Sequence, residues 1–65
     1  MSRGWPASAL WLVPGALADS IRHARAGHRA YASRRFDTAI AEYEAALRAW
    51  SGNAAAWYGL AGARS

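Results

Sequence analysis

The feature that most constrains this chain is an apolar stripe between residues 36 and 50. Apolar side chains recur there at intervals of three and four residues, at positions Phe36, Ala39, Ile40, Tyr43, Ala46, Leu47 and Trp50. This interval is the period of one face of an α-helix, and the positions between are alanine or polar. The pattern predicts an amphipathic helix whose stripe packs against other helices. Glu44 precedes Arg48 by four residues, the order that favours an ion pair along a helix.

Turn-forming residues bound this helix on both sides. Residues 51–53 read Ser-Gly-Asn, and glycine and asparagine tolerate the positive φ of tight turns. Asn53 is also well placed to cap a helix that begins at Ala54. Upstream, residues 33–35 read Ser-Arg-Arg, and Ser33 is the predicted N-cap of the second helix. The sequence thus predicts a further helix on each side of the stripe.

The first helix is predicted to begin at Asp19 or Ser20, either of which can cap it, and to end near Ser33. Four of its residues recur at the spacing of one helix face: Ile21, Ala24, His28 and Tyr31. Gly27 lies inside this helix although glycine costs about 1 kcal/mol of helix propensity. We therefore expect a neighbouring helix to approach closely at Gly27.

Together these patterns resemble the tetratricopeptide repeat (TPR), in which two antiparallel helices form a repeat of about 34 residues. The residues that carry the resemblance are Phe36, Ala39-Ile40, Tyr43, Ala46-Leu47, a polar turn, and Trp57-Tyr58 with Leu60-Ala61. The resemblance implies an all-α fold of about three helices, a fragment of an α-solenoid. Residues 19–53 would form one helix pair, and residues 54–65 the first helix of a following, truncated repeat.

The resemblance also assigns a repeat core, made of Gly27, Phe36, Ala39, Ile40, Tyr43, Ala46, Leu47, Trp57 and Leu60. Two positions depart from the family pattern. Arg34 stands where the turn between the paired helices commonly carries glycine. Ala30 stands where an aromatic residue is common, and Tyr31 follows one place later.

Residues 1–18 differ from the rest and allow several interpretations. A basic start, an apolar run and the sequence Ala16-Leu17-Ala18 are typical of a secretory signal peptide, which would place the protein in the bacterial periplasm or outside the cell. Alternatively, Ala9-Leu10 lies 37 residues before Ala46-Leu47, as expected for a degenerate half repeat of a cytoplasmic protein. A disordered lead or an organelle transit segment is the third interpretation. The apolar run is too short to span a bilayer.

The charge distribution offers one candidate binding surface. All eight basic side chains are arginine, and the formal net charge is +4. Arg22, Arg25 and Arg29 lie three and four residues apart and predict a basic ridge along the first helix. Such a ridge is either a solvated helix face or a cationic groove wall that grips an acidic peptide, since guanidinium groups bind carboxylates in a two-pronged geometry.

Catalysis and bound cofactors are not expected. His23 and His28 are five residues apart, which turns them to different sides of a helix, and Glu42 and Glu44 are two apart, so neither pair shares a metal or an acid-base task. The chain has no cysteine and no glycine-rich phosphate loop.

The sequence therefore favours a module that binds a peptide or partner protein, including an acidic one, next to further repeats in a longer chain. The alternative is a basic helical segment that binds RNA or an anionic membrane surface, with Trp5 and Trp11 as interfacial anchors. Of these partners, nucleic acid is the less favoured.

Overall fold

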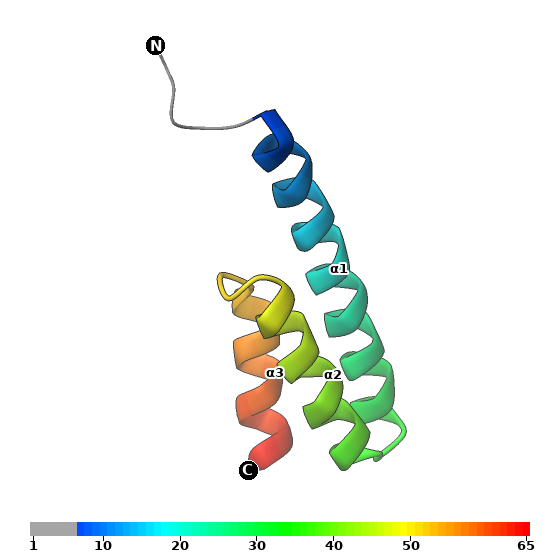
Figure 1. The fold of residues 1–65 in the computed structure, drawn as a ribbon. Helices are drawn as coiled ribbons and strands as arrows, with labels where there is room; N and C mark the ends of the chain where they lie inside the picture. The colour runs from blue at the N-terminus through cyan, green and yellow to red at the C-terminus, as the bar shows by residue number, and fades with distance from the viewer. Residues whose placement is uncertain (1–6) are drawn as a thin grey trace.

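In a computed structural model, the chain forms three α-helices joined by short turns (Figure 1). Helix α1 spans Ala7–Ala32, α2 spans Phe36–Ala49 and α3 spans Ala54–Arg64. The structure describes the backbone of residues 7–65 and the side chains of residues 15–65. Helices α1 and α2 run antiparallel, and α3 packs against both (Figure 1). The predicted all-α fold of about three helices is confirmed. Trp5 and the side chain of Trp11, the suggested interfacial anchors, lie outside the described part.

Helix α1 begins twelve residues earlier than predicted. It starts at Ala7, runs through Pro14 and Gly15, and crosses the expected boundary at residue 18. Proline removes one backbone hydrogen bond from a helix, but alanine and leucine dominate the sequence on both sides of Pro14, and both are strong helix formers. The prediction that Asp19 or Ser20 caps the first helix is therefore wrong, because both residues lie in its interior.

The turn after α1 satisfies the helix end with its own backbone. The N–H of Arg35 donates to the carbonyl of Ala30 at 2.8 Å, and the N–H of Arg34 donates to that of Tyr31 at 3.0 Å. This pair of bonds is the Schellman motif, which needs a left-handed residue that is usually glycine. Arg34 occupies that position with φ 63°. The structure thus places a left-handed backbone at the position where the repeat family commonly has glycine.

The start of α2 differs from the prediction. Arg35, not Ser33, holds the N-cap position, and no side chain caps this helix end. The Schellman turn explains the difference, since it keeps Ser33 bonded to α1, where its N–H donates to the carbonyls of Arg29 and Ala30.

The core is built from small side chains around one tyrosine. Tyr43 is the largest fully buried side chain, with 1% of its surface exposed. The other buried apolar residues are Ala24, Ala30, Ala39, Ala46, Ala56 and Leu60, with Ile40 and Leu47 partly buried against them. Phe36 and Trp57, assigned to the repeat core from the sequence, are instead 44% and 54% exposed. The buried faces of the helices are mostly alanine, and among the described residues Tyr43 supplies the one large ring buried between them.

Two glycines make the close approach possible. A Cβ atom added to Gly27 of α1 would lie 2.7 Å from Cε1 of Tyr43, and one added to Gly59 of α3 would also overlap the Tyr43 ring. The ring is therefore held between the bare backbones of two helices. We call Gly27, Tyr43 and Gly59 the tyrosine contact. The close approach expected at Gly27 is confirmed.

A second set of residues joins the three helices near the other end of α2. Asn53 accepts the N–H of Ala56 on its Oδ1 at 3.1 Å, so its predicted role as the cap of α3 is confirmed. Its Nδ2 donates to Oγ of Ser20 at 2.8 Å, and Ser20 Oγ–H donates to the carbonyl of Ala46 at 2.7 Å. We call Ser20, the Ala46 carbonyl and Asn53 the polar junction. It links α1, the end of α2 and the start of α3.

Candidate functional site

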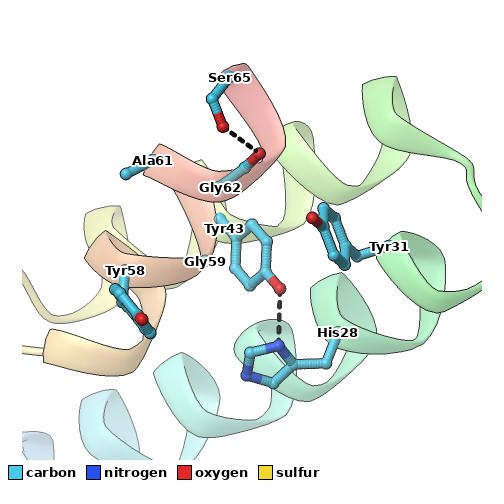
Figure 2. A pocket seen from close by; sticks show the side chains of 8 residues that line it. All are labelled: His28, Tyr31, Tyr43, Tyr58, Gly59, Ala61, Gly62 and Ser65. Carbon is cyan, nitrogen blue, oxygen red and sulfur yellow. Dashed lines mark hydrogen bonds between the residues drawn. The ribbon is translucent and has the colours of Figure 1, made fainter.

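An open groove lies between α1 and α3, with α2 beneath it (Figure 2). Its volume is about 490 Å³. The residues that line it are His28 and Tyr31 of α1, Tyr43 of α2, Tyr58, Gly59, Ala61 and Gly62 of α3, and Ser65. The groove follows from the helix packing. Gly59, Ala61 and Gly62 of α3 have small or no side chains and leave space beside the helix, and aromatic side chains border that space.

Tyr43 and His28 form the polar part of the groove. The Tyr43 hydroxyl and Nδ1 of His28 are hydrogen-bonded at 2.7 Å, and the two rings meet edge to face with centroids 5.4 Å apart (Figure 2). Burial raises the pKa of the Tyr43 phenol above its ordinary value, and the nearby Tyr31 adds to the shift. The phenol therefore stays protonated at neutral pH and holds the His28 ring in a fixed orientation.

The edges of the groove are aromatic and accessible. Tyr58 is 85% exposed and Tyr31 is 44% exposed. Tyr31 also packs edge to face on Phe36, with ring centroids 5.4 Å apart, which holds it in place. No arginine, aspartate or glutamate is found among the described residues that line this groove. Tyrosine rings with hydroxyl groups suit a ligand that presents apolar surface and a few uncharged hydrogen-bonding groups.

The three candidate arginines lie elsewhere. Arg22, Arg25 and Arg29 are exposed and line a shallow hollow on α1 together with Ala18 and Ile21. The ridge is thus present on the helix surface, and its arginines are not among the residues that line the groove between α1 and α3. Residues nine apart on a helix face in opposite directions, and Arg29 follows the buried Ser20 by nine.

Two other pairs of polar or charged side chains join neighbouring helices. Glu44 pairs with Arg64 of α3 at 2.6 Å, not with Arg48 as its spacing predicts. His23 Nδ1 lies 2.8 Å from a carboxylate oxygen of Glu42, which joins α1 to α2. In the part of the chain that the structure describes, no three metal-ligating side chains come together.

Comparison with known proteins gives no relative. No protein-family model, no curated protein and no solved structure matches the chain. Among the described residues, no helix combines the length and the apolar character that crossing a membrane requires.

Sequence reasoning missed the groove and the polar junction. The sequence pattern groups Tyr58 with the packing residues of the third helix, although almost all of its surface is accessible. The same pattern predicts Ser20 as a helix cap, although its hydroxyl is buried between helices. A signal for Ser20 did exist, since a serine four residues before the buried Ala24 and seven before Gly27 belongs to the same helix face.

Proposed function

We propose that this chain is a TPR-like helix-pair module that binds a segment of a partner protein in the groove between α1 and α3. The observation that carries the proposal is the groove itself, with accessible tyrosines at its edges and a fixed Tyr43–His28 pair at its floor. The antiparallel α1–α2 pair and the docking of α3 against both helices support the TPR-like interpretation. The residues that line the groove favour a mainly uncharged peptide.

The proposal implies binding without catalysis, and the groove offers hydroxyl and imidazole groups that can hydrogen-bond a peptide. Neighbouring repeats in a longer chain would extend the same groove, because repeat modules stack side by side. If residues 1–18 act as a signal peptide, the module works in the periplasm or outside the cell, and otherwise in the cytoplasm.

Selection from a random peptide library displayed on phage tests the proposal. We expect enriched peptides that bind the purified chain. Their affinity for Tyr58→Ala should be at least about tenfold lower, because truncating an aromatic anchor at an interface typically costs more than about 1 kcal/mol of binding free energy. Trp57→Ala is the matched control: its indole is also exposed but lies on the opposite side of α3, among Leu47, Leu60 and Arg64. Circular dichroism would show that both variants remain helical. Failure to enrich any peptide, or equal losses in the two variants, would overturn the proposal.

A further inference from the structure

The exposed surface of α1 combines arginines with apolar side chains. Leu17 and Ile21 are 37% and 41% exposed, one turn apart on this helix. Arg22, Arg25 and Arg29 follow them within two turns and are exposed. Ile21 and the three arginines share a hollow of about 420 Å³ with Ala18. This surface is separate from the groove between α1 and α3.

The charge on this surface is unbalanced. Asp19 is the sole acidic residue in residues 1–36, and its carboxylate is bonded to Arg22. Arg25 and Arg29 form no ion pair with the described carboxylates. Their guanidinium groups are therefore available to anionic groups outside the chain, and guanidinium binds phosphate in a two-pronged geometry.

The backbone of the amino-terminal half of α1 extends beyond the bundle. The end of α2 contacts α1 at Ser20, so the part of α1 that precedes Ser20 projects past the other two helices (Figure 1). In the sequence, residues 7–18 contain no charged side chain and nine of their twelve are apolar. At 1.5 Å per residue this projecting part is about 18 Å long. Helices that lie in a membrane interface carry basic side chains beside exposed apolar ones, as α1 does at Ile21 and Arg25.

We propose that α1 binds an anionic lipid surface, lying along it with the arginines at the phosphate level. Lipid headgroups would occupy the hollow between Arg22, Arg25 and Arg29, and Leu17 and Ile21 would contact the upper acyl region. The exposed Leu17 and Ile21 favour lipid over RNA, because RNA offers phosphates without an apolar layer beside them. The proposal goes beyond the peptide groove and does not depend on it.

Vesicle sedimentation tests the proposal with the whole chain. We expect binding to vesicles of phosphatidylcholine with one quarter phosphatidylglycerol, and much weaker binding to phosphatidylcholine alone. Replacing Arg22, Arg25 and Arg29 with glutamine should reduce the affinity about 100-fold, since each arginine near an anionic surface contributes about fivefold. The control is the same replacement at Arg34, Arg35 and Arg48, which removes equal charge from the turn and α2 and should cost far less.

A second pair of variants separates lipid from RNA. The double variant Leu17→Ser with Ile21→Ser should weaken vesicle binding while leaving the three arginines in place. A single-stranded RNA oligonucleotide should bind the original chain no better than it binds the variant with glutamine at positions 34, 35 and 48. Four results would overturn the proposal: equal binding to neutral vesicles, equal losses in the two arginine triples, no effect of the serine pair, or RNA binding without vesicle binding. Tyr58→Ala should leave vesicle binding unchanged, so failure here is distinguishable from failure of the peptide groove.

Discussion

The tyrosine contact and the polar junction both join all three helices, and they do so by different means. At the tyrosine contact, one buried ring fills the space between the bare backbones of Gly27 and Gly59. At the polar junction, Asn53 at the start of α3 donates a hydrogen bond to Ser20 of α1, and Ser20 donates one to the Ala46 carbonyl of α2. The first selects residues by size and the second by hydrogen-bonding groups. A chain with few large apolar side chains thus fixes its helix packing through two unrelated kinds of specificity.

The two regions should differ in how much stability each substitution removes. Overfilling a tightly packed site forces neighbouring side chains or backbone to move, at about 1–3 kcal/mol. A typical hydrogen bond contributes about 1 kcal/mol net, because the unfolded chain bonds to water instead. We therefore expect the most costly substitutions to be those that add atoms at the tyrosine contact.

The largest expected effect is that of Gly59→Ala. The added methyl group would overlap the Tyr43 ring, which is 1% exposed and held by the hydrogen bond of its hydroxyl group to His28. We expect the free energy of unfolding to fall by about 2–3 kcal/mol, even though alanine is the better helix former. Urea unfolding followed by circular dichroism would measure it.

Gly62→Ala is the matched control in the same helix. Nothing lies within 4 Å of a Cβ atom at Gly62, so the substitution adds helix propensity without a collision. It should stabilise the chain by about 0.5–1 kcal/mol. If both alanines stabilised the fold equally, the tyrosine contact would not restrict residue size.

At the polar junction, Asn53→Ala should destabilise the chain by about 2 kcal/mol, because it removes the cap of α3 and leaves the Ser20 hydroxyl without its donor. Asn53→Ser separates the two contributions. Serine caps a helix but is too short to reach Ser20, so it should lose about 1 kcal/mol. Chemical denaturation would measure the free energy of unfolding of both variants. An Asn53→Ser chain as stable as the original would show that the hydrogen bond to Ser20 contributes nothing.

Local sequence signals predicted some of this architecture well. The period of the stripe located α2, and Asn53 directly before an apolar segment indicated the cap of α3. A glycine inside a predicted helix indicated close packing at Gly27. These signals work because each depends on residues within one or two helical turns of one another.

Features that depend on packing between helices were not predictable in the same way. Ser20 looks like a cap until α2 and α3 are seen to surround it. The helical period also could not show that Trp57 lies outside the core, since that depends on how far apart alanine faces hold the helices. The groove arises from three helices at once, so no single segment carried its pattern.

Tyr43→Phe tests the polar edge of the tyrosine contact. The variant keeps the ring and loses the hydroxyl bond to His28, and we expect a loss of about 1 kcal/mol near neutral pH. The raised pKa of Tyr43 also makes a pH-dependent contribution. Because folding favours the protonated phenol, this stability is fully present below the ordinary tyrosine pKa of about 10 and is lost as pH rises through the folded value.

Unfolding measurements at about pH 9 and about pH 11 would detect this difference, since tyrosine titrates between them. The original chain should lose more stability over this interval than Tyr43→Phe. Tyr58→Phe is the control, because Tyr58 is mostly exposed and its removal should leave the alkaline loss unchanged. An equal alkaline loss in the original chain and Tyr43→Phe would show that another group is responsible.

The smallest expected effect lies in the turn between α1 and α2, outside both contacts. Arg34 holds φ 63°, a left-handed conformation that costs a residue with a Cβ about 1 kcal/mol or more. Arg34→Gly removes this strain but makes the unfolded chain more flexible, so the net stabilisation should be about 0.5–1 kcal/mol. Arg35→Gly is the control: φ at Arg35 is −93°, so glycine adds flexibility without relieving strain and should destabilise. A thermal unfolding midpoint that rises for the first variant and falls for the second would show that the left-handed backbone at Arg34 is strained. If neither midpoint moved, this turn would carry no strain that glycine relieves.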